Sequence, residues 1–141
     1  MPQAAPSVPT RELAVGARAA VGFSIDERQM RQFAELSGDF NPLHTDDAFA
    51  QGKGFQSKVV YGALLIAKVS ELIGMRLPGR DSVWASLALD FRRPLYVDQA
   101  AELEATVSSV SESTGMVELA LVLRLAGKVL AKGRAEVIVG Q

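Results

Sequence analysis

The spacing of hydrophobic and polar positions in the first half of the chain predicts a short strand followed by a helix. Residues 18–23 (RAAVGF) are suited to the strand. We expect the helix to begin at Ser24, because Glu27 follows three residues later at the spacing of a capping box. Apolar residues then recur at helical spacing up to Gly38, a natural stop. The next stretch is irregular apart from a single turn expected at 46–50.

A second helix is predicted at residues 62–73 (GALLIAKVSELI), which are apolar on nearly every face. Such a helix is expected to lie buried in the middle of the protein. Lys68 and Glu71 share one narrow polar stripe. Ser70 lies about 200° around the helix from Lys68, at about 100° per residue. We therefore expect Ser70 to point into the apolar side, where its hydroxyl needs a partner.

Apolar and polar residues alternate through much of the second half, as is typical of strands. We expect four of them, at residues 83–91, 101–109, 116–125 and 129–139. The links at 112–115 and 126–128 are short enough for antiparallel hairpins. One strand, then helices, then an antiparallel meander make an α+β pattern. A single sheet that curls around one apolar helix satisfies both halves.

The composition narrows the range of chemistry. A length of 141 residues with 48% hydrophobic and 22% charged residues indicates one folded domain rather than a disordered chain. A net charge of −1 argues against nucleic-acid binding, which needs a basic face. The absence of cysteine excludes disulfides, thiolate zinc sites and a cysteine nucleophile. Any imidazole chemistry must use the single histidine, His44.

The N-terminal sequence MPQAAPSVPT contains three prolines among small residues. We expect a flexible arm at 1–10 and one domain at 11–141. The arm has neither the basic stretch nor the apolar stretch of a signal peptide. The longest apolar run, 59–67, is too short to cross a bilayer. We therefore expect a cytoplasmic protein that does not contact a membrane.

The irregular stretch contains the histidine beside carboxylates and an amide. Asp39 and His44 together could hold a water, take its proton and return a proton to a carbon acid. Asn41 supplies a donor and an acceptor that could orient the water. Turn formation alone stays an alternative, because Asp and Asn often bond their own backbone. We expect no metal, because His44, Asp46 and Asp47 lie too close in sequence to close a tetrahedral zinc site readily.

The sequence around the histidine resembles a known family motif. Residues 33–46, FAELSGDFNPLHTD, resemble the hydratase-2 motif of the MaoC-like family, the (R)-specific enoyl-CoA hydratases and related dehydratases. Residues 59–65, VVYGALL, resemble the stretch that leads into the central helix of the family. Residues 77–79 and 89–96 resemble its later landmarks. The resemblance extends over about residues 12–139, nearly the whole chain.

The resemblance implies a hot-dog fold, in which an antiparallel sheet wraps a long central helix. It also implies a homodimer with acyl-thioester sites near the subunit interface. The catalytic residues of the family fall on Asp39 and His44, and its asparagine falls on Asn41. Its oxyanion-hole glycine falls on Gly62 and its helix serine on Ser70. No cofactor is implied beyond the coenzyme A of the substrate.

The implied reaction adds water to a trans-2-enoyl thioester to give the (R)-3-hydroxyacyl thioester, or reverses this step. Asp39 and His44 would hold the water that attacks C3. The N–H of Gly62 would stabilise the charge on the thioester oxygen. Ser70 would help fix the loop or the imidazole. Candidates for gripping coenzyme A phosphates or an acyl-carrier protein are Arg76, Arg80, Arg92 and Arg93.

One position departs from the family pattern. The family usually has histidine immediately before the helix glycine, and this chain has Tyr61. Tyrosine can donate a hydrogen bond but does not titrate near neutral pH. We expect Tyr61 to change the wall of the site and to leave the Asp39/His44 pair intact. A packing aromatic with a hydrated hydroxyl is the alternative interpretation of Tyr61.

Three other activities stay open. A 3-hydroxyacyl-ACP dehydratase would run the same chemistry on an acyl-carrier protein. A hot-dog thioesterase would need a carboxylate on the central helix, where Glu71 is the candidate, but pairing with Lys68 is the simpler account of that residue. A non-catalytic binder of acyl thioesters is disfavoured by the presence of both Asp39 and His44.

Overall fold

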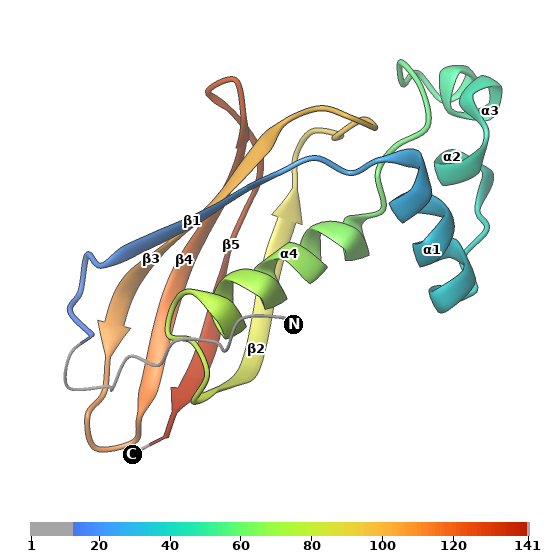
Figure 1. The fold of residues 1–141 in the computed structure, drawn as a ribbon. Coiled ribbons are helices and arrows are strands. Elements are labelled where there is room, and N and C mark those ends of the chain that lie inside the picture. The colour runs from blue at the N-terminus through green and yellow to red at the C-terminus, as the bar shows by residue number, and fades with distance from the viewer. Residues whose placement is uncertain (1–12, 141) are drawn as a thin grey trace.

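The computed structural model describes residues 13–140, so the arm expected at 1–10 lies outside the described residues. The strands of this part are β1 Arg18–Phe23, β2 Ser82–Phe91, β3 Ala101–Val110, β4 Met116–Leu125 and β5 Lys128–Val139. They form one antiparallel sheet in the order β1-β3-β4-β5-β2 (Figure 1). The five predicted strands are confirmed, and no end is shifted by more than one residue.

The register of the sheet follows from the alternating pattern and from two tight links. In β3 the buried residues alternate with residues that are more exposed; the buried ones are Ala101, Leu103, Ala105 and Val107. Val110 pairs with Val117 across the β3–β4 link, and Leu125 pairs with Lys128 across the β4–β5 link. Both predicted hairpins are therefore present. In the described part of the chain β1 and β2 are the edge strands.

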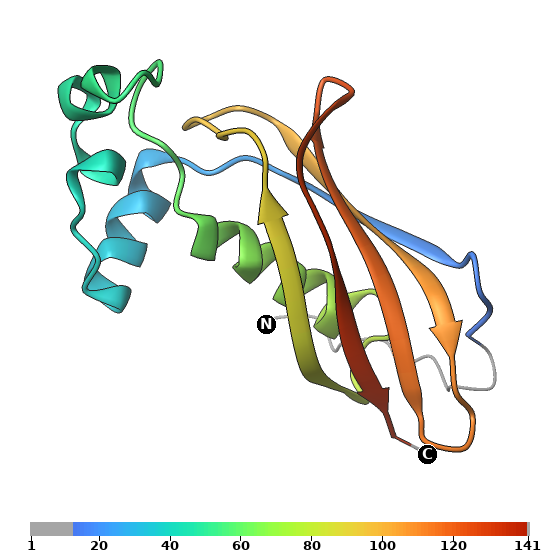
Figure 2. The same cartoon turned by 180° about the vertical axis from the view of Figure 1, so that it is seen from behind.

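Helix α4, Gly62–Met75, lies against one face of the curved sheet (Figures 1 and 2). Its buried residues recur at helical spacing: Leu65, Val69, Leu72 and Ile73. They join the core residues of the strands in one hydrophobic cluster. This is the α+β hot-dog arrangement that the resemblance implied.

The opposite face of α4 differs from the prediction. Ala63, Ala67 and Ser70 are exposed there, so in the described chain the sheet covers only one side of the helix. The expectation that Ser70 points inward is therefore wrong. The serine was placed opposite the Lys68 and Glu71 stripe, but that stripe lies at the margin of the buried face and is itself only half-buried.

Helix α1 is Glu27–Ser37, and Asp26 rather than Ser24 caps its N-terminus. Asp26 and Gln29 form the capping box, with backbone N–H to side-chain oxygen distances of 2.8 and 3.0 Å. The helix cannot begin at Ser24 because Ile25 is only 1% exposed and its carbonyl accepts a bond from the backbone N–H of Asp98. The predicted stop is confirmed.

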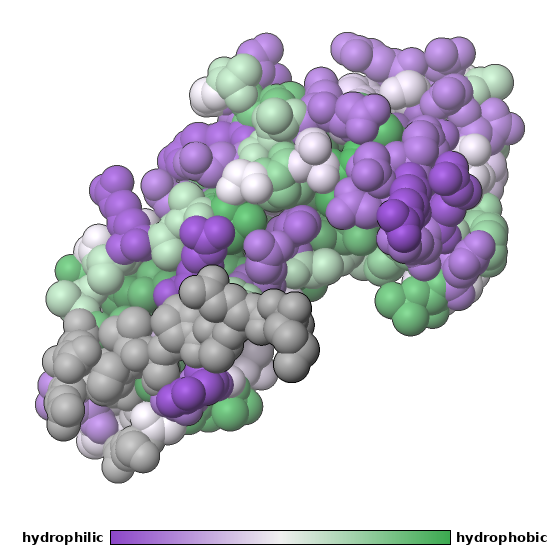
Figure 3. All heavy atoms as spheres, viewed as in Figure 1, coloured by the Kyte–Doolittle hydropathy of each residue, from purple (hydrophilic) through white to green (hydrophobic). Residues whose placement is uncertain are grey.

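Two short helices replace the single turn that we expected at 46–50: α2, Pro42–Thr45, and α3, Asp47–Gly52. The side chain of Asn41 caps α2 and that of Asp46 caps α3. Helices α1–α3 gather beyond one end of the sheet, beside the N-terminus of α4 (Figure 2). Many hydrophilic residues lie over this end of the molecule in Figure 3. The predicted catalytic residues therefore lie where the helical end meets α4.

The helices of the described residues fall short of a membrane span: none of them has both the length and the apolar character to cross a bilayer. The longest of them, α4, has 14 residues.

Candidate active site

His44 lies in α2 with its ring half-buried and oriented by one bond. Its Nδ1 is 2.7 Å from the backbone carbonyl oxygen of Val59. A carbonyl oxygen can only accept, so in the neutral ring Nδ1 carries the hydrogen and Nε2 keeps the lone pair. Nε2 makes no hydrogen bond with residues 13–140. The ring is therefore held in the tautomer that can take a proton from a water molecule at Nε2.

Residues 59 and 60 form a short extended link between α2 and the segment that follows β2. The Val59 N–H donates to the Leu43 carbonyl (3.0 Å), and the Val60 N–H donates to the Leu95 carbonyl (2.9 Å). Val59 also forms an isolated antiparallel bridge with Tyr96. The link that carries the Val59 carbonyl, the acceptor of His44, is thus bonded both to α2 and to the segment after β2.

Asp39 follows α1 at the exposed start of the loop. Its Oδ1 accepts from the Asn41 N–H at 3.0 Å, and its own N–H donates to the Ser37 hydroxyl at 3.1 Å. Asn41 in turn accepts the Leu43 N–H at 2.9 Å. The turn chemistry that we left open is therefore present at both residues. It leaves Oδ2 of Asp39 and the amide NH₂ of Asn41 without a hydrogen bond to the described residues.

Tyr61 stands between the two predicted catalytic residues. It is 2% exposed, its ring stacks on His44 at a centroid distance of 4.1 Å and 26°, and its hydroxyl donates to the Asp39 carbonyl at 2.7 Å. Its ring also packs in a tilted arrangement against that of Phe33, with centroids 4.7 Å apart. Burial raises the pKa of Tyr61, and the nearby charge of Asp39 raises it further. The hydrated hydroxyl of our alternative interpretation is absent, because the hydroxyl is buried and bonded.

Gly62 is the first residue of α4, directly after Tyr61. The first bonds inside the helix are donated by Leu64 and Leu65 to the Tyr61 carbonyl, and Tyr61 supplies no side-chain cap. The N–H groups of Gly62 and Ala63 therefore have no acceptor among the described residues. Free N–H groups at a helix N-terminus stabilise negative charge. These N–H groups are therefore available to bind an anionic oxygen.

A close neighbour leaves little room for a side chain at this position. A Cβ at Gly62 would lie 3.1 Å from Cζ of Phe91, the last residue of β2. The Phe91 ring is 50% exposed and lies in the wall of the same cavity as Gly62. Sequence reasoning quoted Phe91 as a family landmark but gave it no role, because nothing local signals that the end of β2 meets the start of α4.

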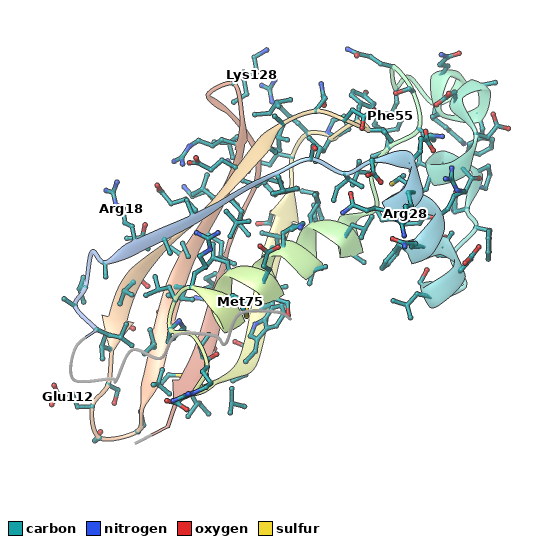
Figure 4. The ribbon with its side chains drawn as sticks, in the orientation of Figure 1. Arg18, Arg28, Phe55, Met75, Glu112 and Lys128 are labelled. Carbon is teal, nitrogen blue, oxygen red and sulfur yellow. The ribbon has the colours of Figure 1, made fainter. Side chains whose placement is uncertain are left out.

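Two cavities meet at His44. One has a volume of about 370 Å³; besides His44 its wall includes Phe55, Gly62, Phe91, Arg92 and Arg93. The other has a volume of about 380 Å³ and lies against α1; its wall includes Met30, Phe40, His44 and the ion-paired Glu27 and Lys58. Figure 4 shows Phe55 at the helical end and Met75 at the far end of α4. The imidazole is therefore reachable from two sides.

Of the remaining predicted site residues, Ser70 lies away from Gly62 along α4, and only some of the arginines line the cavity. Ser70 is eight residues beyond Gly62, about 12 Å along the helix at 1.5 Å per residue. Its hydroxyl makes no hydrogen bond with residues 13–140, and its supporting role stays a prediction. Of the four arginines, two line the cavity that contains Gly62, whereas Arg76 and Arg80 follow the other end of α4. The described residues include no group of three or more potential metal ligands.

The sheet around one helix, with an aspartate, a histidine and free helix N–H groups at one end, defines a hot-dog protein of the dehydratase class. Residues 7–131 match the family model described as the MaoC like domain. The chain belongs to this family.

Individual relatives agree with this assignment over most of their length. The chain is 34% identical over 121 residues to the (R)-specific enoyl-CoA hydratase of Aeromonas caviae, covering 86% of this chain and 90% of that protein. It is 29% identical over 124 residues to the 3-hydroxybutyryl-CoA dehydratase of Methylorubrum extorquens, covering 88% and 79%. The structure is similar to that of an R-hydratase from Pseudomonas aeruginosa, with a TM-score of 0.88, 32% identity and coverage of 96% and 87%.

Proposed function

We propose that the protein adds water to trans-2-enoyl-CoA to give (R)-3-hydroxyacyl-CoA, or catalyses the reverse dehydration. The observation that carries the proposal is that His44 and the open N–H of Gly62 line one cavity. An acid–base group and an oxyanion donor on one cavity are what the reaction of an enoyl thioester with water requires. The names of the relatives that match most of the chain support the substrate class.

The water is the nucleophile of the proposed reaction. Nε2 of His44 and the unbonded Oδ2 of Asp39 hold it, and its oxygen forms a bond to C3 of the enoyl group. One water proton passes to the Asp39/His44 pair as the electron pair of the double bond moves toward C1. A proton from the pair then forms the new C2–H bond, so the elements of one water are added across C2 and C3.

Charge develops on the thioester oxygen during the attack on C3. The N–H of Gly62, at the positive end of α4, donates to that oxygen. Donors placed in advance need no rearrangement as charge develops, and removing one such donor typically costs about 10²–10³ in kcat. No metal and no cofactor is needed for these steps.

The carrier of the acyl group is proposed to be coenzyme A. Arg92 and Arg93 line the cavity that contains Gly62, and guanidinium groups suit phosphate oxygens. Asn41 would add its free amide NH₂ as a donor to the water.

The thioesterase alternative is weaker. The Glu71 carboxylate lies 3.0 Å from the ammonium of Lys68 and is thus already paired. Glu71 is also nine residues from Gly62, about 13 Å along α4. A carboxylate at that distance cannot attack a thioester whose oxygen is bound at Gly62.

The proposal includes a homodimer, as the resemblance implied, and a cytoplasmic location. Two features support the dimer: β2 is an edge strand whose Val83 is 64% exposed, and the outer face of α4 presents Ala63 and Ala67. Light scattering on the purified protein tests it, and a monomer at micromolar concentration would contradict it. Cell fractionation tests the location.

Crotonyl-CoA provides the direct test of activity. Loss of the enoyl-thioester absorbance without thiol release, with (R)-3-hydroxybutyryl-CoA as the product, is the expected result. Loss with thiol release would establish hydrolysis instead. No loss with enoyl-CoA of any chain length, but turnover of enoyl-ACP, would place the activity on the acyl-carrier protein. No turnover of either would favour a binder.

A further inference from the structure

We propose that Tyr61 is a positioning residue that fixes His44, Asp39 and Gly62 relative to one another. This inference rests on the proposed function for its kinetic consequences, but its structural part can be measured without turnover. Tyr61 contacts the imidazole through its ring and the loop through its hydroxyl, and it precedes the oxyanion donor in the chain.

The His44 ring is held at two points. The bond from Nδ1 to the Val59 carbonyl fixes one edge of the ring, but a single hydrogen bond tolerates changes in the tilt of the ring. Tyr61 lies against the face of the imidazole, with ring planes 26° apart and centroids 4.1 Å apart. A stacked neighbour restricts that tilt. Together the two contacts direct Nε2 to one position.

The Asp39 turn is held by the hydroxyl of the same residue. The hydroxyl donates to the Asp39 carbonyl across 22 residues of sequence, at 2.7 Å. Within residues 13–140 the carboxylate of Asp39 is bonded only to the N–H of Asn41 in the same turn, so its orientation follows the position of the turn. The other hydrogen bonds of Asp39 among the described residues join it only to near neighbours in sequence, Ser37 at the end of α1 and Asn41 in the loop.

Tyr61 is itself firmly placed. It is 2% exposed and packs on Phe33 of α1. Its backbone carbonyl accepts the first N–H bonds of α4. A displacement of Tyr61 therefore moves the N–H of Gly62 together with His44 and Asp39. Misplacement by about 1 Å is enough to cost about 10² in rate, so this linkage bears directly on turnover.

Graded substitutions separate the two contacts. Tyr61→Phe keeps the stacked ring and removes the hydroxyl, and we expect kcat to fall about tenfold, the effect of one hydrogen bond. Tyr61→Leu removes both contacts, and we expect a fall of about 10². KM for crotonyl-CoA should change by less than about twofold in both, because the losses arise in positioning.

Tyr96→Phe is the matched control. It also removes a tyrosine hydroxyl that bonds a backbone group, here the N–H of Gln56 at 3.0 Å. It touches neither Asp39 nor His44, and we expect kcat within about twofold of the parent. If Tyr61→Phe loses no more activity than Tyr96→Phe, the hydroxyl has no positioning role.

The tautomer of the single histidine can be measured, and a general loss of packing would not change it. Only His44 contributes imidazole signals, so a ¹⁵N spectrum reports its tautomer without ambiguity. We expect the Nδ1–H tautomer in the parent and in Tyr61→Phe, and a mixture of tautomers in Tyr61→Leu. An unchanged tautomer and unchanged kcat in Tyr61→Leu would overturn the proposal.

Two further outcomes are distinguishable. If the parent does not turn over any enoyl thioester, the proposed function fails, and the tautomer of His44 in the Tyr61 variants still decides the positioning role. If Tyr61→Leu does not fold, Tyr61→Phe decides the hydroxyl, and Tyr61→Met, which removes the aromatic ring and adds no second imidazole, decides the stacking. A mixture of His44 tautomers in that variant would support the stacking role, whereas an unchanged tautomer with kcat equal to that of the parent would refute it.

Discussion

Replacement of Gly62 by alanine adds one methyl group, which we expect to lower activity while leaving the free energy of unfolding almost unchanged. Alanine stabilises relative to glycine by about 0.5–1 kcal/mol in a helix interior, and by less at the first residue of a helix, where Gly62 lies. Against this, the new Cβ would lie 3.1 Å from Cζ of Phe91, so the ring must move by a few tenths of an ångström. The ring is half-exposed and can move outward, at a cost of under about 1 kcal/mol. The two effects nearly cancel, and we expect the free energy of unfolding to change by less than about 1 kcal/mol.

The same methyl group is expected to abolish most of the activity. A donor works only when the developing oxyanion can reach about 2.7–3.1 Å from the N–H, and the Cβ of residue 62 crowds that approach. We expect kcat for crotonyl-CoA to fall about 10²-fold. Urea unfolding and initial rates on the same preparation provide the two measurements.

Gly74→Ala is the matched control in the same helix, because a Cβ there meets nothing within 4 Å. It should keep full activity. The double variant Gly62→Ala with Phe91→Leu relieves the contact with the ring without clearing the N–H. If it restores kcat, the loss arose from the displaced ring. A stable Gly62→Ala protein with wild-type kcat would refute the assignment of Gly62 as the oxyanion donor.

Three further predictions concern the pair, the core and alkaline pH. Asp39→Asn and His44→Ala should each lower kcat for crotonyl-CoA by about 10²-fold or more. A near-parental kcat in either variant would refute the catalytic role of the pair. Leu72→Ala, at a site that is 0% exposed, should lower the free energy of unfolding in urea by about 2–5 kcal/mol, whereas exposed Leu36→Ala should change it by less than about 0.5 kcal/mol. The pKa of Tyr61 is raised in the folded chain, so its contribution to stability is complete below about pH 10 and is lost as the pH rises further. Tyr61→Phe should reduce that alkaline loss in thermal unfolding, and an equal loss in both proteins would contradict the buried, protonated hydroxyl.

The strands and the start of α4 could be predicted because their signals are local. Alternation fixes which face of β3 is buried, and Gly62 is the first residue of the helix as predicted. The helix continues through Gly74 to Met75, two residues past its predicted end at residue 73. The start of α1 could not be settled locally, because both Ser24 with Glu27 and Asp26 with Gln29 have capping-box spacing. The burial of Ile25 in the core decided between them.

The resemblance identified the candidate site residues, but the contacts between them could not be predicted from the sequence. Nothing near Tyr61 in the sequence shows that its hydroxyl reaches Asp39, which precedes it by 22 residues. The Val59 carbonyl, the acceptor of His44, carries no side-chain signal at all. The inward direction predicted for Ser70 failed because helical periodicity gives the angle between residues but not which side the sheet covers.

The extended link at residues 59 and 60 connects the orientation of His44 to local opening of the fold. The amide protons of Val59 and Val60 are bonded to the Leu43 and Leu95 carbonyls, one in the helical end and one beside the sheet. The Val59 proton exchanges with solvent when the link separates from α2, and the Val60 proton when the link separates from Leu95. Separation of the link from α2 would also release Nδ1 of His44 from its acceptor. Slow amide exchange at Val59 and a correctly oriented imidazole should therefore be lost together.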